Sequence, residues 1–416
     1  MPSSALPLAY YFLGYASFGA AMLALAIDPS IPGASFYQPR FVALVHLVTL
    51  GWLTGSILGS LYIVAPLALG VPLPVRKADW FAFAAFVLGA SGMVAHFWIN
   101  TYDGMAWSAV LAVGAVARVG SRVVRGLRDS RVPWGVRLHI VLAFTNIVAA
   151  AVLGMVIGFD RSRGFLAISP LATTFAHAHI AAVGFVMMLV IGLSYRLIPM
   201  MLPAAMPSGR SIAWSAILLE SGVATVAVSL MIDSSAVVAG ALLIAAGVVS
   251  FVRHVRAMLG RRLPRPPALP ARDWSTWQVH MAFGCLVVTV AAGLVLSFGA
   301  SADRRLSLMW IYGIAGLIGF LAQMVAGMQG RLVPLYAWYR AYAAIGAPPL
   351  RPANALPSPF FARSIFLCWA AAVPLLLWGL PFANQFVIRT GALCLLAGVT
   401  LGASYVRHLL REARRV

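Results

Sequence analysis

Long apolar runs recur along the whole chain, and they limit its possible folds more than any other feature. Of its 416 residues, 62% are hydrophobic and only 10% are charged, which is unlike the composition of soluble globular domains. A helix needs about 20 mostly apolar residues to cross the hydrocarbon core of a bilayer. Twelve runs of that kind lie near residues 8–28, 41–69, 80–99, 104–122, 135–159, 172–203, 211–231, 234–258, 275–299, 308–338, 361–382 and 386–408. We therefore predict an all-α polytopic membrane protein with about twelve transmembrane helices.

The first run has no basic segment before it and no clear cleavage site, so we predict a retained span rather than a signal peptide.

The distribution of basic residues predicts the orientation of these spans. The formal net charge is +20, but the charges gather on one side of the predicted membrane. The side that carries both termini holds 24 of the 30 Lys and Arg residues. By the positive-inside rule this side is cytoplasmic. The charge therefore indicates topology and contact with anionic membrane lipids, and nucleic acid is not an expected partner. We predict a bacterial inner-membrane location.

One motif occurs three times along the chain. The first copy starts at His46 and the second at His179. Both continue with glycine at the fifth and thirteenth following positions, an aromatic residue at the sixth, tyrosine at the sixteenth and proline at the twentieth. The third copy starts at Ile314 instead of a histidine, and Gly330 takes the place of the tyrosine. The copies start 133 and 135 residues apart, so they indicate three large similar units rather than a solenoid.

Twelve spans and three motif copies give four spans to each unit, with the motif on the second span. We predict a single transmembrane domain over 1–416, with internal repeats at approximately 1–130, 131–262 and 263–416. The proline-rich stretch at 263–267 is predicted to be a short linker between the last two repeats. Three four-helix units suggest a pseudo-threefold arrangement with the motif helices lining its centre.

Each motif copy is long enough to cross the membrane. From its first position to its proline it advances 20 residues, or about 30 Å of α-helix. This places His46 and His179 near the outer, periplasmic side. At roughly 100° per residue, the motif glycines lie on the opposite face of the helix from these histidines. His177 lies on the glycine face, so the sixth span presents imidazoles to two different neighbours.

The outer half of the spans contains four histidines, which are the candidate metal ligands: His46, His96, His177 and His179. Polar groups inside a membrane are costly and usually functional, and imidazole binds heme iron and copper. We predict heme b as the cofactor, with copper as a second candidate. Gly51 and Gly184 are predicted to let a flat macrocycle approach the helix. Two alternatives stay open, since a histidine can simply bond a neighbouring helix and motif glycines can serve close helix packing.

Other side chains add little chemistry. Glu220 is the one acidic residue deep in a span, where it belongs either to a proton path or to a local hydrogen bond. The three cysteines all lie inside spans and form no CxxC or CxxCH motif. A disulfide framework and covalent heme attachment are therefore not expected.

Three features together resemble the heme-copper oxidase catalytic subunit superfamily, which includes the nitric oxide reductase large subunits. These are the twelve spans in a pseudo-threefold arrangement, the run from His46 to Trp52 with Tyr62 and Pro66 beyond it, and the pair His177 and His179 on the sixth span. The resemblance implies that His46 ligates a low-spin heme. It also implies that His177 or His179 ligates a non-heme metal.

The chain departs from that superfamily in two places. The tenth span has no histidine, and the paired histidines near the seventh span are missing. The usual binuclear centre cannot be assembled, so a conventional proton-pumping oxidase is not expected. We hypothesise instead a heme pocket between the second and sixth spans, with His46 and either His179 or His177 as axial ligands.

The predicted function is electron transfer or the handling of nitric oxide or oxygen. The protein would then be an oxidoreductase or a subunit of one, with a redox partner subunit or a periplasmic cytochrome as its partner. The alternative is a metal-free transporter or structural membrane subunit on the same fold.

Overall fold

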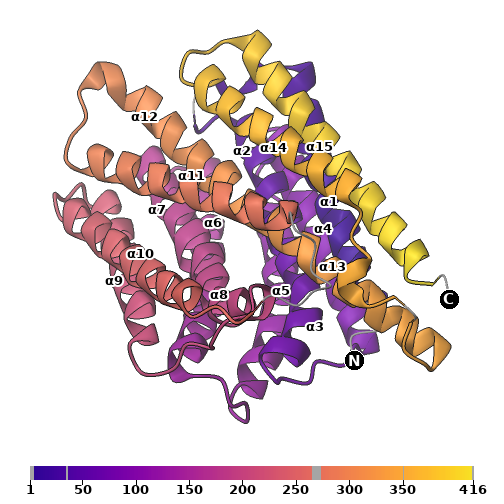
Figure 1. The fold of residues 1–416 in the computed structure, drawn as a ribbon. Coiled ribbons are helices and arrows are strands. Elements are labelled where there is room, and N and C mark those ends of the chain that lie inside the picture. The colour runs from indigo at the N-terminus through magenta and orange to yellow at the C-terminus, as the bar shows by residue number, and fades with distance from the viewer. Residues whose placement is uncertain (1–3, 34–35, 265–272, 350, 415–416) are drawn as a thin grey trace. The chain divides into compact units, whose positions relative to one another are not determined.

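A computed structural model describes residues 4–33, 36–264, 273–349 and 351–414 of the chain. Within these residues the secondary structure is helical, and twelve helices are long and apolar enough to cross a membrane. The prediction of an all-α polytopic membrane protein is confirmed (Figure 1). The predicted linker at 263–267 lies mostly outside the described residues.

The chain divides into two compact units. Unit 1 contains the described parts of 1–66, 265–292 and 300–416, and unit 2 contains 67–264 and 293–299. Unit 1 thus combines spans of the first and third predicted repeats. Its helices are α1 (Leu6–Ile27), α2 (Pro39–His46), η2 (Leu47–Thr54), α3 (Gly55–Ala68), α11 (Trp274–Ser297), α12 (Ala302–Ile314), η4 (Ala315–Ala322), α13 (Gln323–Ile345), α14 (Pro359–Gly379) and α15 (Gln385–Glu412), with short 3-10 turns η1 (Ile31–Gly33) and η5 (Ala353–Ala355). The ends of α3 and α11 continue into unit 2.

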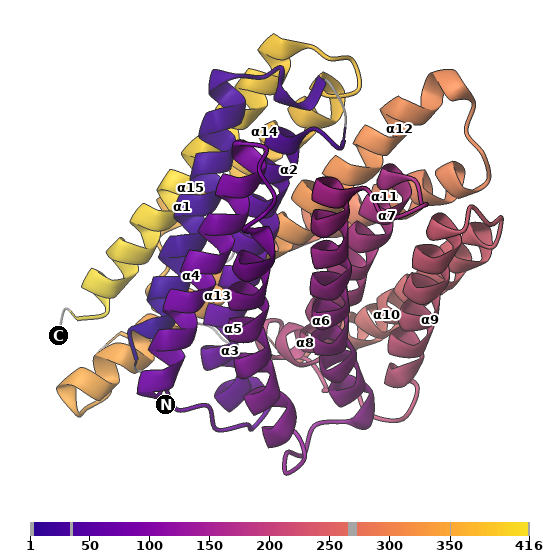
Figure 2. The same ribbon diagram turned by 180° about the vertical axis from the view of Figure 1, so that it is seen from behind.

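Unit 2 contains the second repeat and the last two spans of the first. Its helices are α4 (Lys77–Trp98), α5 (Met105–Gly126), α6 (Trp134–Arg163), α7 (Pro170–His179), η3 (Ile180–Met187), α8 (Met188–Met201), α9 (Ile212–Met231) and α10 (Val237–Gly260). Helices that follow one another along the chain pack as pairs in both units, as α4 with α5, α9 with α10, and α14 with α15 (Figures 1 and 2).

Proline and glycine set several helix ends. Proline starts α2, α7 and α14, where its fixed φ suits the first turn and its missing N–H costs no helical bond. Gly164 ends α6 with φ of 62° and Gly346 ends α13 with φ of 79°. That left-handed conformation is open to glycine without strain.

Many large apolar side chains point away from the packed interior of each unit. Phe81 on α4 is 76% exposed and Val287 on α11 is 68% exposed. In a soluble protein such surfaces would drive association, whereas lipid tails cover them in a membrane. The outward apolar faces therefore agree with the predicted spans.

Candidate functional site

A π-helical segment follows the first position of the motif in every copy. η2 begins directly after His46, η3 directly after His179 and η4 directly after Ile314, and each is eight residues long. π-helical segments are rare and occur often at functional sites. The motif is thus a structural repeat as well as a sequence repeat. A uniform 100° per residue does not apply across these segments, because i→i+5 bonding turns the chain less per residue than an α-helix. His177 and Gly184 nevertheless both contact α6, which agrees with the prediction that His177 lies on the glycine face.

His46 is the last residue of α2 and is half-buried in unit 1. Its ring nitrogen Nδ1 lies 2.8 Å from the carbonyl oxygen of Val42. A carbonyl oxygen only accepts hydrogen bonds, so Nδ1 donates its proton to it. The lone pair of the neutral ring is then on Nε2.

His179 repeats this arrangement in unit 2. Its Nδ1 donates to the carbonyl oxygen of Phe175 at 2.7 Å, again one turn back in its own helix. His177 differs, because its Nδ1 donates at 2.9 Å to the carbonyl oxygen of Ala150 on α6. The two rings of the His-x-His pair are therefore held by different helices, and both keep Nε2 as the lone-pair nitrogen.

His96 lies in the last turn of α4 in unit 2. Its Nδ1 donates to the carbonyl oxygen of Thr101 at 2.8 Å and so closes the turn after the helix. Within the described residues, no group of three or more His, Cys, Asp or Glu side chains is placed to hold a metal ion. The structure therefore does not bring His96, His177 and His179 together as one metal site.

The first motif glycine packs against the first helix of its repeat in all three copies. A Cβ atom added to Gly51 would lie 2.1 Å from the Cβ of Ser17, and one added to Gly184 would lie 2.7 Å from the Cγ of Asn146. In the third copy the corresponding contact is 2.7 Å from Gly319 to the sulfur of Cys285. The space beside Gly51 and Gly184, the predicted cofactor contacts, is filled by these side chains.

The second motif glycine makes the same kind of contact seven residues earlier on the same helices. An added Cβ would lie 3.0 Å from the Tyr10 Cβ at Gly59, 2.5 Å from the His139 Cβ at Gly192, and 3.3 Å from the Gln278 Cβ at Gly327. Tyr10, His139 and Gln278 are therefore equivalent positions of the three repeats.

In the second repeat, the motif tyrosine completes a buried polar cluster. Tyr195 and His139 are both 0% exposed, and their ring centroids lie 5.6 Å apart. The hydroxyl oxygen of Ser215 on α9 lies 3.0 Å from His139 Nε2 and 2.9 Å from the Tyr195 hydroxyl oxygen. Both ring nitrogens of the buried His139 therefore have hydrogen-bond partners within the protein, since Nδ1 also lies 2.7 Å from the carbonyl oxygen of Gly135.

Glu220 lies near the same helices of unit 2. The side-chain amide of Asn146 on α6 donates to a Glu220 carboxyl oxygen at 2.6 Å and to the carbonyl oxygen of Leu142 at 3.0 Å. This contact is the local hydrogen bond that the sequence left open as one of two alternatives. It also explains the glycine at 184, because Asn146 is seated against it.

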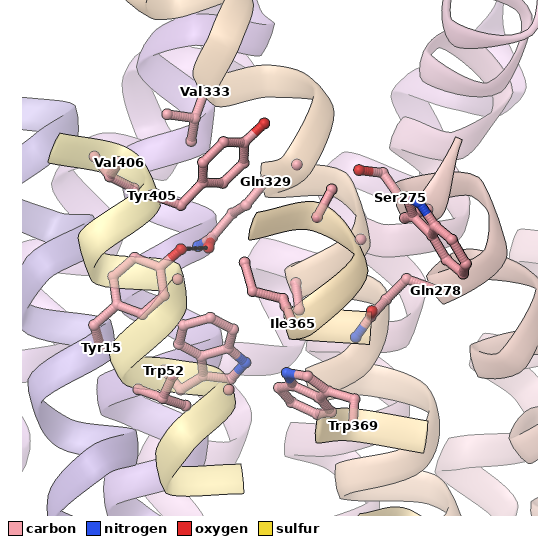
Figure 3. Close-up of a pocket in the computed structure, with 18 residues that line it drawn as sticks. Tyr15, Trp52, Ser275, Gln278, Gln329, Val333, Ile365, Trp369, Tyr405 and Val406 are labelled. Atoms are coloured by element: carbon pink, nitrogen blue, oxygen red, sulfur yellow. Dashed lines mark hydrogen bonds between the residues drawn. The ribbon is translucent and has the colours of Figure 1, made fainter. Parts of the chain in front are cut away.

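Unit 1 contains a cavity of about 40 Å³ where α1, η2, α11, α13, α14 and α15 meet (Figure 3). Its aromatic walls are Trp52, Trp274, Trp369, Tyr15 and Tyr405, and its other polar side chains are Ser275, Gln278 and Gln329. Gln278 is 3% exposed, and its amide nitrogen has no hydrogen-bond partner among the described residues. Figure 3 shows that amide directed toward the space between Ile365 and Trp369.

Two buried links connect the walls of this cavity. The Tyr15 hydroxyl donates to the Gln329 side-chain oxygen at 2.8 Å, and the Gln329 amide nitrogen donates to Ser56 at 2.9 Å. The Trp52 indole donates to the carbonyl oxygen of Ala322 at 3.1 Å. The links join α1, α3 and η2 of the first repeat to η4 and α13 of the third within unit 1.

Reasoning from the sequence missed Gln278, Gln329 and Tyr15. The available signal was Gly330, which replaces a tyrosine of the motif and lines this cavity. A glycine at a position of large side chains indicates either a close contact or vacant space.

The fold and these sites define an all-α, multi-pass membrane protein with polar side chains buried inside its helical units. A scan of the chain against protein-family models finds no match, and a search of curated proteins finds none that is similar.

Proposed function

We propose that this membrane protein binds one or two b-type hemes near its periplasmic side and acts in electron transfer or in the handling of nitric oxide or oxygen. His46 and His179 are the axial-ligand candidates, and His177 is the alternative to His179. Copper is a second candidate metal. The resemblance to the heme-copper oxidase catalytic subunit superfamily is part of the same proposal.

One observation carries the proposal. His46, His177 and His179 each donate Nδ1–H to a backbone carbonyl oxygen at 2.7–2.9 Å. Histidine ligands usually donate their second nitrogen in this way, which fixes the tautomer and the ring orientation. The donor chemistry of these residues therefore fits axial ligation through Nε2.

The roles of the protein's own residues follow from this chemistry. Val42 and Phe175 hold the His46 and His179 rings through their carbonyl oxygens, and Ala150 does the same for His177 from α6. When bound, a heme supplies one-electron chemistry, and its axial ligation decides between electron transfer and gas binding. The motif glycines at 51 and 184 seat neighbouring helices, and their contact with a cofactor stays a prediction.

The cellular setting belongs to the proposal as well. The basic residues favour a bacterial inner membrane with both termini in the cytoplasm. Lipids surround the outward apolar faces, and a redox partner subunit or a periplasmic cytochrome would exchange electrons at the outer side.

An absorbance spectrum with iron and copper analysis tests the proposal. The protein is purified from cells with full heme supply, and a Soret band with stoichiometric iron is expected. His46→Ala and His179→Ala are expected to remove or shift that band. His254→Ala is the matched control, because this histidine bonds Ser250 and Ser211 near the predicted cytoplasmic end of α10.

A colourless, metal-free preparation of the folded protein would rule out the heme proposal. It would leave the transporter or structural-subunit alternative on the same fold. Equal loss of the band in the His254→Ala variant would contradict the ligand assignment and keep only heme binding.

A further inference from the structure

Besides Ile314, the third repeat differs from the second at two positions that line the unit 1 cavity. Position sixteen is Tyr62 or Tyr195 in the first two copies and Gly330 in the third. The position that is His139 in the second repeat is Gln278 in the third. Gly330 and Gln278 both line the unit 1 cavity, whereas the Tyr195 and His139 rings pack together in unit 2. The cavity thus lies beside the one motif copy that has glycine in place of the tyrosine.

Gln278 requires a hydrogen-bond partner that the described protein does not provide. Its side chain is 3% exposed and its amide nitrogen has no partner among the described residues. Leaving a buried polar group unpaired is costly, and native proteins avoid it by including ordered water. The amide is directed into the cavity (Figure 3), so the partner belongs there.

The size and charge of the cavity restrict what that partner is. The side chains that line it are all uncharged, so a neutral ligand fits. A bound water needs a cavity volume of about 10–15 Å³, measured as the space open to a water-sized sphere. A dry apolar cavity that binds benzene is larger, at about 150 Å³. The 40 Å³ observed therefore suits about three water molecules.

We propose that the unit 1 cavity is an internal water-binding site. Gln278 and Tyr15 hold the water molecules by hydrogen bonds, and the aromatic side chains enclose them. Water accepts from the Gln278 amide. It also donates to the Tyr15 hydroxyl oxygen, whose own proton goes to Gln329. The hydrogen-bonded chain then passes through the Gln329 amide to Ser56. An amide does not release a proton at neutral pH, so the site stores water rather than conducting protons on to Ser56.

This proposal is independent of heme binding. The lining side chains include no histidine, and hydration of the cavity is measured without reference to a cofactor. Where the second repeat has a packed imidazole and tyrosine, the third repeat then has a water-filled space.

Radiolytic hydroxyl-radical footprinting of the full chain in nanodiscs tests the proposal, because radicals formed from bound water label the side chains beside it. Trp369 is 1% exposed and lines the cavity, while Trp310 is 7% exposed and does not. Trp369 is expected to be labelled several-fold faster than Trp310. Likewise Tyr405, which lines the cavity, is expected to be labelled faster than the buried Tyr195 of unit 2.

Two variants separate bound water from general mobility. Ala362→Leu places a larger side chain in the cavity, and Gln278→Leu removes the amide at similar size; both are expected to slow the labelling of Trp369 and Tyr405. Gln323→Leu is the control, since Gln323 is buried at the same helix interface but does not line the cavity. Wild-type labelling of Trp369 no faster than that of Trp310 would overturn the proposal without any variant. So would equal slowing by Gln323→Leu and Gln278→Leu.

Discussion

The histidines and glycines of the motif have separate tasks in the structure. The glycines at the fifth and thirteenth positions contact the preceding helix in all three repeats, whether or not a histidine starts the copy. The histidines at the first position donate Nδ1–H to backbone carbonyl oxygens. Helix packing and these histidine hydrogen bonds are therefore carried by different residues of one motif.

Substituting Gly184 with alanine is expected to destabilise the protein. The new methyl group would lie 2.7 Å from Asn146 Cγ, and overpacking of this kind costs about 1–3 kcal/mol. Thermal unfolding of the purified protein measures the loss. Gly114→Ala is the matched control, because nothing lies within 4 Å of a Cβ added there. An equal effect of both substitutions would contradict the packing role.

The sequence alone singled out some residues of the candidate sites and missed others. The histidines were visible as a repeat, because identical offsets in two copies are hard to produce by chance. Gln278 was not visible, because a single glutamine in an apolar run carries no spacing signal. Its importance depends on Gly330, which lies 52 residues further along the chain and lines the same cavity only after folding.

At the scale of elements, the spans were predictable and their internal geometry was not. Hydrophobic length fixed all twelve helices, since the membrane requires about 20 apolar residues for each crossing. The π-helical segments η2, η3 and η4 left no mark in composition or periodicity. They begin directly after the first position of the motif in each copy.

One ion pair ties α13 to the chain segment before α11. Arg331 bonds Asp273, and their side chains are only 19% and 20% exposed. Arg331→Ala is expected to lower the free energy of unfolding by about 1–3 kcal/mol, because the partly buried carboxylate loses its charged partner and, among the described residues, keeps only Ser275 and Thr276.

The exposed pair Arg304–Asp303 provides the control for this prediction. Its side chains are 81% and 76% exposed, and exposed pairs contribute little to stability. Arg304→Ala is expected to leave the unfolding temperature unchanged in the same assay. If Arg304→Ala lowered the unfolding temperature as much as Arg331→Ala, the contribution of an ion pair to stability would depend on its charge and not on its burial.

At the scale of the whole molecule, the twelve spans and the basic residues together predict the topology. The loop with Ser301, between α11 and α12, should face the periplasm, and the loop with Ser208, between α8 and α9, should face the cytoplasm. Ser301→Cys is expected to react with a membrane-impermeant thiol reagent on intact cells, and Ser208→Cys only after lysis. The three native cysteines lie in α11, α14 and α15, so the parent protein serves as the blank. The reverse pattern would invert the topology.

The π-helical segment after Ile314 bears on how the chain arose. All three repeats carry this segment at the same offset, but only two of them carry the histidine before it. A shared irregularity of that kind is most simply inherited from one ancestral four-helix unit that was duplicated before the copies diverged. The segment is present beside an isoleucine as well as beside the two histidines, so this backbone geometry does not require a histidine before it. The backbone irregularity therefore belongs to the repeat as a whole, while the side chain that precedes it differs between the copies.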